Sequence, residues 1–413
     1  MSIGRGVRIS LIIVAIAGTL GAGGYGVGQL AAKRTRATRL REAERAAPQA
    51  VAVCQEYAFA NKVECYRRGL TTRLGLGNVA GVAGVMATLD AIARLDPDVA
   101  YEGHVFAHGV GIEAYLRFKD VPGTFLACGD GFASGCRHGV IQAYLEARPR
   151  VTAADVNALC APFDRFASSN WMFYQCLHGM GHGLTMLYSH DLPRALVDCD
   201  SLSGAWHRDS CYSGAFMENI VNATAPHHPA SELAAKSHHH TTFKALDPAD
   251  PLYPCTIVPR RQQMACYLVQ TSAILAVNHG DIPAAGRACD QAPERMRSTC
   301  YMSLGRDISS FARRDTRESA RLCGLGGVAG RPHCYAGVVK SLVDWTSTTD
   351  SGFAFCRGLD STDVAGRRQC YFALGEQISA LTWTGVARSL ACRHAEEPAA
   401  IEACREGAKV RGG

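Results

Sequence analysis

The chain has 413 residues, more than one ordinary hydrophobic core accommodates, so its length predicts two domains or an elongated array of repeats. Hydrophobic residues make up 47% of the sequence, which is enough material for a folded structure. The formal net charge is +6, and much of it lies in one N-terminal cluster. The charge therefore does not predict a nucleic-acid partner.

An apolar segment lies near the N-terminus. Residues 9–32 are nearly uncharged and follow Arg5 and Arg8. The segment can span a bilayer, for which about 20 apolar residues suffice. We expect residues 1–32 to be a transmembrane anchor that holds the protein on a membrane; a cleaved signal peptide, which would leave a secreted protein, is the alternative. Residues 33–50 are predicted to be a basic juxtamembrane linker, whose charges do not prevent translocation of a long domain.

Local disulfide bonds are the main architectural prediction. The sequence holds 18 cysteines, and in chain order they form neighbouring pairs that are mostly 11 to 14 residues apart. The predicted pairs are Cys54 with Cys65, Cys128 with Cys136, Cys160 with Cys176, Cys199 with Cys211, Cys255 with Cys266, Cys289 with Cys300, Cys323 with Cys334, Cys356 with Cys370, and Cys392 with Cys404. Each bridge should stabilise the fold by about 3 kcal/mol in the chain-entropy model. Such bridges predict a soluble part outside the cytoplasm, in the periplasm or extracellular space; a cytosolic protein with reduced, buried thiols is the alternative.

The cysteines also recur with a fixed period. The second members of the last five pairs, from Cys266 to Cys404, are spaced by 34, 34, 36 and 34 residues. A period of this length is typical of solenoids built from helix pairs. We expect the first helix of a unit to begin near the second cysteine of a pair, as at Cys300, and the second helix to end at the next cysteine, as at Cys323. The sequence thus predicts an all-α, disulfide-stapled helical-repeat solenoid behind the N-terminal segment.

Two units carry the pattern Tyr-x2-Leu-Gly-x2-Ile, from Tyr301 to Ile308 and from Tyr371 to Ile378. With the 34-residue period, this pattern resembles the first helix of a tetratricopeptide or Sel1-like repeat. The resemblance covers residues 255–413. It implies an α-solenoid whose concave face binds a protein or peptide partner.

The same frame runs back into the N-terminal half, so residues 51–222 are also predicted to be helical repeats. A small residue stands three positions after most cysteines that begin a unit, as at Gly139, Gly179 and Gly214. We interpret these residues as points of close packing between helices. Residues 223–254 are rich in proline and histidine and are predicted to be an inserted loop between the two sets of repeats.

Five histidines form the candidate site. His138 and His178 each stand two residues after a cysteine, and His108 precedes a glycine as they do. Three consecutive units should therefore present one histidine each along one inner surface. His104 and His182 lie four residues from His108 and His178 respectively, a spacing that places both imidazoles of a pair on one helix face. Two imidazoles at this spacing can bind one metal ion.

We expect the five histidines to converge on one pocket and to hold one or two transition-metal ions. Imidazole suits zinc, copper and iron, and the sequence does not choose among them. Glu113 and Glu218 are the predicted carboxylate partners. They lie five residues beyond His108 and Ser213 respectively, which hold equivalent positions in their helices. The absence of a His-Glu-x-x-His motif argues against a zincin-type protease.

Two functions are consistent with these patterns. The first is an extracytoplasmic, membrane-anchored, metal-binding repeat protein whose imidazole-rich site could serve a metalloenzyme. The alternative is a non-enzymatic α-solenoid scaffold for protein–protein interaction, in which the histidines would be structural.

Overall fold

The computed structural model describes residues 34–75, 78–148, 150–164, 169–224 and 242–409. Within these residues the chain forms helices joined by turns and has no β-strand, which confirms the all-α prediction. The expected anchor or signal segment, residues 1–32, lies outside them. Among the described helices, none combines the length and the apolar character that a membrane crossing needs.

The N-terminal half starts with a helix over residues 34–54. The helices that follow are α2 (Phe59–Leu74), α3 (Val82–Ala93), α4 (Pro97–Phe118), α5 (Val121–Ala127), α6 (Gly135–Glu146), α7 (Ala153–Leu159), α8 (Trp171–Leu187), α9 (Leu192–Asp200) and α10 (Ala205–Thr224). Short 3-10 turns precede or follow some of them: η1 (Val79–Gly81), η2 (Phe132–Ser134) and η3 (Ala161–Phe163).

The C-terminal half continues the same alternation. Its helices are α12 (Arg260–Tyr267), α13 (Gln270–Val277), α14 (Ile282–Gln291), α15 (Glu294–Phe311), α16 (Thr316–Leu325), α17 (Arg331–Thr346), α18 (Asp350–Arg357), α19 (Val364–Leu381), α20 (Gly385–Cys392) and α21 (Pro398–Gly407), with the turn η4 (Arg393–Ala395).

The segment predicted to be a linker, residues 33–50, is helical from residue 34 onward, which corrects that prediction. Ala43, Ala47 and Val51 recur every four residues on one face of this helix and are buried. Such a stripe packs against the body of the protein even though the rest of the helix is charged. Of the predicted insertion, residues 242–254 form turns without a regular helix, and residues 225–241, with their histidines, lie outside the described part.

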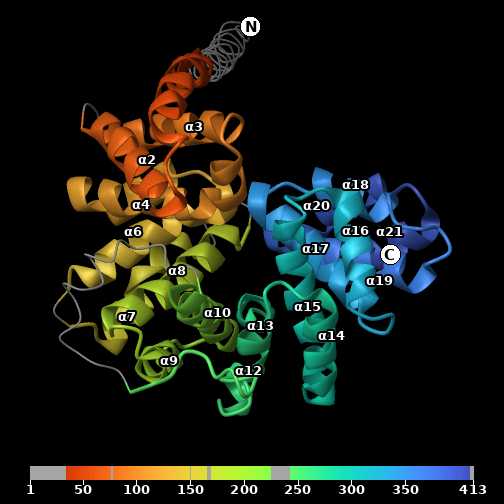
Figure 1. Ribbon diagram of the computed structural model, residues 1–413. Coiled ribbons are helices and arrows are strands. Elements are labelled where there is room, and N and C mark those ends of the chain that lie inside the picture. Colours follow the sequence, from red (N-terminus) through yellow and green to blue (C-terminus); the bar gives the residue numbers. More distant parts are fainter. Residues whose placement is uncertain (1–33, 76–77, 149, 165–168, 225–241, 410–413) are drawn as a thin grey trace, which may run out of the picture.

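Long helices pack in a continuous row. In the N-terminal half α4 packs on α6, α6 on α8 and α8 on α10; in the C-terminal half α15 packs on α17, α17 on α19 and α19 on α21. Helices α12 and α13 connect α10 to α15, while the shorter α14, α16 and α18 form a second row. The row bends back on itself, so that the two halves meet (Figure 1).

All nine predicted disulfides are present, and every cysteine is bonded to its neighbour in the sequence. The bridges join Cys54 to Cys65, Cys128 to Cys136, Cys160 to Cys176, Cys199 to Cys211, Cys255 to Cys266, Cys289 to Cys300, Cys323 to Cys334, Cys356 to Cys370, and Cys392 to Cys404. Most of them connect the end of a short helix to the long helix that follows, as Cys289 of α14 is bonded to Cys300 of α15. The pairing rule is therefore confirmed for the whole chain.

The prediction that each long helix begins near the second cysteine of a pair is wrong for most of these helices. Cys136, the second residue of α6, and Cys334, the fourth residue of α17, fit it. Other cysteines lie well inside their helices: Cys176 in α8, Cys300 in α15 and Cys370 in α19. The bridges explain this offset, because their Cα atoms are only 5.4–5.7 Å apart. The preceding short helix must therefore end beside the long helix, which extends a turn or more beyond the contact.

The column of small residues marks close contacts between successive long helices, as interpreted from the sequence. A Cβ atom added at Gly139, Gly214 or Gly337 would collide with a backbone carbonyl oxygen of the preceding long helix. Only glycine permits this approach, because any larger side chain would push the helix axes apart. The backbones of α4, α6, α8 and α10 are therefore held close together where the histidines lie.

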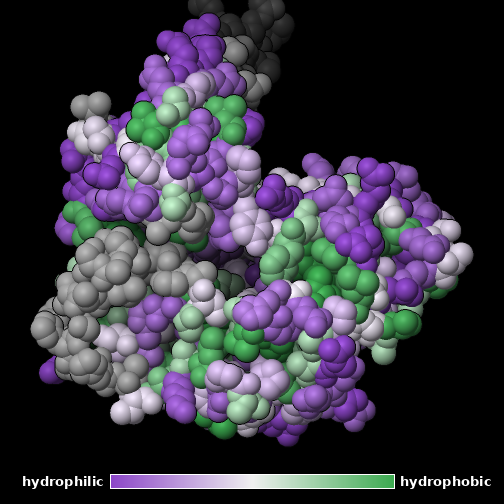
Figure 2. Space-filling view, viewed as in Figure 1, coloured by the Kyte–Doolittle hydropathy of each residue, from purple (hydrophilic) through white to green (hydrophobic). Residues whose placement is uncertain are grey.

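The two halves touch through side chains that are far apart in the sequence. The rings of Phe132 in η2 and Trp345 in α17 make an edge-to-face contact, with centroids 5.7 Å apart. Ser347 donates a hydrogen bond of 3.4 Å to the carbonyl oxygen of Asp130, and Arg314 donates one to the carbonyl oxygen of Ala100. A hollow lies between the halves on the face shown in Figure 2.

Candidate metal centre

The five predicted histidines converge. His104 and His108 come from α4, His138 from α6, and His178 and His182 from α8. They form two groups, His104/His108/His138 and His138/His178/His182, and in each group one ring nitrogen per residue lies within 4.8 Å of the others. The five histidines therefore lie in one cluster, and His138 belongs to both groups.

The local sequence explains the convergence. The i, i+4 spacing places the two imidazoles of α8 on one face, with ring centroids 4.9 Å apart. Close helix packing then brings the faces of α4, α6 and α8 together. A Cβ atom at Gly139 would collide with the carbonyl oxygen of His108, and one at Gly179 would lie 3.1 Å from the Cα of His138. Gly139 and Gly179 thus each pack against the histidine of the preceding helix.

Hydrogen bonds outside the cluster orient the rings. Nδ1 of His104 lies 2.9 Å from the carbonyl oxygen of Phe132, and Nδ1 of His182 lies 2.8 Å from Oε2 of Glu218. Both acceptors require an N–H, so both rings carry their proton on Nδ1. Metal-binding histidines in proteins usually donate their second N–H in this way, to a backbone carbonyl or a carboxylate.

His138 and His178 are oriented by neutral side chains. Nε2 of His138 lies 2.8 Å from Oε1 of Gln175. Its Nδ1 is buried and has no hydrogen-bond partner among the described residues. Nδ1 of His178 lies 2.8 Å from Oγ of Ser213, which donates its own proton to the carbonyl oxygen of Ser210. Ser213 therefore accepts from His178, and the His178 proton is on Nδ1 as well.

These proton positions bring two nitrogen lone pairs together. The Nε2 atoms of His178 and His182 are 3.2 Å apart, and with both protons on Nδ1 each Nε2 points a lone pair into the gap. A cation in the gap would bind both lone pairs. Two nitrogens that each lie about 2.0–2.1 Å from a tetrahedral zinc ion stand about 3.3–3.4 Å apart, so the observed separation fits two ligands of one ion.

Burial favours the neutral, metal-binding form of the rings. His108, His138, His178 and His182 are all buried, while His104 is half-buried. Burial lowers the pKa of His138 and of His178 well below 6.5, and the neighbouring histidines lower it further. The ring nitrogens of His138 and His178 are therefore available to a metal ion.

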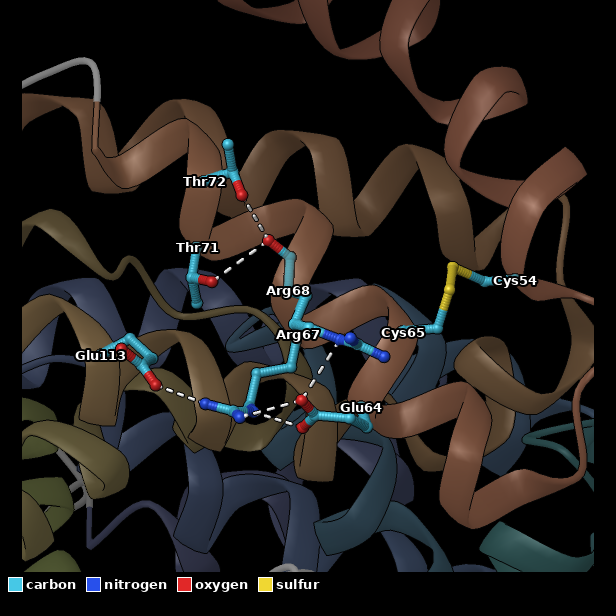
Figure 3. A network of polar contacts seen from close by, with 8 residues as sticks. All are labelled: Cys54, Glu64, Cys65, Arg67, Arg68, Thr71, Thr72 and Glu113. Carbon is cyan, nitrogen blue, oxygen red and sulfur yellow. Dashed lines mark hydrogen bonds and ion pairs between the residues drawn. A yellow bond between two sulfur atoms is a disulfide. The ribbon is translucent and has the colours of Figure 1, made fainter.

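Glu113 does not join the cluster, which corrects the prediction for this residue. Its carboxylate pairs with Arg67 of α2, which also bonds Glu64 (Figure 3), and all three side chains are partly exposed. Glu218 does reach the cluster, but as the hydrogen-bond acceptor of His182 rather than as a member of either nitrogen group. Its side chain is buried.

Sequence reasoning missed several residues around the histidines. Gln175 and Ser213 orient two of the rings, and Nε2 of His190 lies 3.5 Å from Oε1 of Glu218. Ser213 stands two residues after Cys211, as His138 and His178 do after their cysteines, so this column of equivalent positions could have identified it. Gln175 and His190 carry no such signal, because Gln175 lies outside that column and His190 lies in the turn after α8.

An aromatic ring of α8 and a charged residue of the C-terminal half both act on His178. The Tyr174 ring stacks on His178 with centroids 5.7 Å apart, and burial raises the pKa of Tyr174. Arg306 of α15 and Asp344 of α17 form an ion pair of 3.4 Å, and the positive charge of Arg306 contributes to the lowered pKa of His178. The C-terminal half therefore acts on His178 through the charge of Arg306.

No protein-family model matches this chain, and no curated protein or solved structure shows significant similarity to it. The function must therefore be inferred from the side chains of the cluster. They define a buried, imidazole-rich centre in an all-helical fold stabilised by nine disulfides. Disulfides in this number indicate an oxidising environment outside the cytoplasm.

Proposed function

We propose that this chain is an extracytoplasmic metal-binding protein whose histidine cluster holds a transition-metal ion. The observation that carries the proposal is the approach of Nε2 of His178 to Nε2 of His182, 3.2 Å apart, with both Nδ1 atoms committed to outside acceptors. Such an arrangement is repulsive without a cation and matches the spacing of two metal ligands.

The ligand set favours one ion. His138 offers only Nδ1, because its Nε2 is bonded to Gln175, and one ring nitrogen binds one ion. We assign His138, His178 and His182 as the primary ligands, since all three are buried and lie in one group. His108 and His104 lie next to them, with ring centroids 5.5 Å from that of His182 and 5.4 Å from that of His138 respectively, and either can supply a further nitrogen.

The donor atoms suit zinc, copper or iron, as expected for imidazole ligands. Zinc at this site would polarise a bound water or a carbonyl group, whereas copper or iron would add redox chemistry. In either case the protein supplies neutral rings, fixed by Phe132, Ser213 and Glu218, in a site shielded from bulk water. A metalloenzyme is the extension of the proposal that this chemistry supports.

Two expectations from the sequence belong to the same proposal. Residues 9–32 would anchor the protein in a membrane with its disulfide-bonded part outside the cytoplasm, supported by their uncharged composition and by the nine bridges. The units of residues 255–413 would be tetratricopeptide- or Sel1-like, supported by the row of long helices packed each on the next.

Metal content tests the proposal. The full chain, purified with its disulfides intact, should contain one transition-metal ion per molecule by elemental mass spectrometry. His178→Ala and His182→Ala should lose it. His394→Ala should keep it, since this exposed histidine lies in η4 near the other end of the chain.

Absence of metal from the wild-type chain, even after incubation with zinc, copper and iron salts, would overturn the proposal. The scaffold alternative, with a partner protein or peptide on the inner face, would then be preferred. Metal that persists in both His178→Ala and His182→Ala would instead place the ion elsewhere in the chain and overturn the assignment of the ligands.

A further inference from the structure

The turn beside His104 has an unusual backbone. Phe132, Ala133 and Ser134 all have positive φ values, 55°, 50° and 60°. Residues other than glycine rarely adopt this left-handed conformation, and three in succession are rarer still. On the facing helix α4, Glu102 departs from helical geometry with φ −106° and ψ 25°. Backbone strain of this kind persists only where the surroundings enforce it, and it is concentrated at functional sites.

The strained turn makes direct contact with a histidine of the cluster. The carbonyl oxygen of Phe132 lies 2.9 Å from Nδ1 of His104. The Phe132 ring packs on the α4 backbone at Gly103, where an added Cβ atom would collide with it. A Cβ atom at Gly135, the residue after the turn, would lie 2.5 Å from the carbonyl oxygen of His104. The conformation of η2 therefore sets both the ring of His104 and the position of its backbone.

The C-terminal half holds this turn in place. Trp345 packs edge-to-face on Phe132 at 5.7 Å and 84°, and Ser347 donates to the carbonyl oxygen of Asp130 just before the turn. Arg314 lies over the other side of the contact, 3.8 Å from the centre of the Trp345 ring, and donates to the carbonyl oxygen of Ala100 in α4. These groups come from residues more than 200 positions further along the chain.

We infer that Trp345 is a positioning residue for the metal centre and acts through Phe132 on His104. The first group, His104/His108/His138, is complete only while α17 lies against η2. Separation of the two halves removes the contacts that enforce the left-handed turn. The Phe132 carbonyl then leaves His104, and the ring loses its orientation toward His138. This inference rests on the proposed metal binding and adds that the C-terminal half, which contains none of the five histidines, controls metal affinity.

A double-mutant cycle tests the inference. Loss of an outer hydrogen bond to a metal-binding histidine typically weakens metal affinity about 10–100-fold. W345A should weaken affinity for zinc, measured by competition with a chelator, by about this factor. H104A should do the same, and the double variant should be little weaker than either single variant, because both changes remove the same interaction. W345F, which keeps an aromatic ring against Phe132, should retain affinity near that of the wild type.

The control is W383A, which removes a partly exposed tryptophan beyond the end of α19 and should bind zinc as the wild type does. Circular dichroism establishes that each variant is folded; if W345A does not fold, the cycle uses W345L, which keeps apolar bulk. Two results would overturn the inference. One is a folded W345A whose zinc affinity equals that of the wild type; the other is a double variant whose loss of affinity is the product of the two single losses. Failure of the proposed function is distinguishable, because the wild-type chain would then bind no zinc at all.

Discussion

Gly139 offers the sharpest test of how closely the helices of the cluster must pack. A Cβ atom at this position would lie 3.0 Å from the carbonyl carbon of His108 and 3.0 Å from the backbone nitrogen of Ile112, and closer still to the His108 oxygen. Nonbonded carbon atoms are at their optimum at about 3.5–4.0 Å. Gly139→Ala should therefore force α4 and α6 apart by about 1 Å, because the added Cβ atom would lie only 2.2 Å from the His108 oxygen.

The expected cost follows from this displacement. Overpacking of a well-packed site costs about 1–3 kcal/mol, and the higher helix propensity of alanine offsets about 0.5–1 kcal/mol of it. Gly139→Ala should thus lower the free energy of unfolding by about 1–2 kcal/mol. It should also weaken metal binding, because His108 and His138 lie on the two helices that separate.

The matched control is Gly109→Ala, in the same His-Gly dipeptide one helix earlier. A Cβ atom at Gly109 would meet only the side chain of Arg67, at 3.6 Å, which is an ordinary contact. This substitution should stabilise the protein by about 0.5–1 kcal/mol through helix propensity alone. Urea unfolding with the disulfides intact measures both variants as shifts of the midpoint at constant slope. Equal stability and equal metal affinity in the two variants would refute the close packing of α4 and α6.

Two further predictions concern electrostatics. Glu218→Gln removes the charge that faces Nδ1 of His182 and should weaken metal affinity about 10–100-fold. Glu113→Gln, which changes the partner of Arg67, should leave metal affinity unchanged. A chelator competition that ranks the two variants the other way would contradict the assignment. In the metal-free protein the pKa values of His138 and His178 are lowered, so below pH 6.5 the unfolded chain takes up protons that the folded chain does not. Stability should therefore fall as the pH drops below about 6.5. A urea midpoint that is higher at pH 5.5 than at pH 7.5 would show that these rings are not held neutral.

The two glutamates show where sequence spacing stops being informative. Glu113 and Glu218 each lie five residues beyond the equivalent helix position, which rotates them about 140° away from it at 100° per residue. Both consequently face the preceding long helix, α2 for Glu113 and α8 for Glu218. Arg67 is on α2 and His182 is on α8, so the same offset gives an outer ion pair in one case and a contact with the cluster in the other.

The sequence by itself determined the helical class, the nine disulfide pairs and the convergence of the five histidines. All three depend on neighbouring units, and a fixed period records which residues of neighbouring units are equivalent. Tertiary structure alone decided which ring nitrogens face inward, because Gln175, Ser213 and Glu218 act from other helices. It also decided that Trp345 would reach Phe132. That contact depends on how small rotations between successive helices add up along the row, and no spacing in the sequence records their sum.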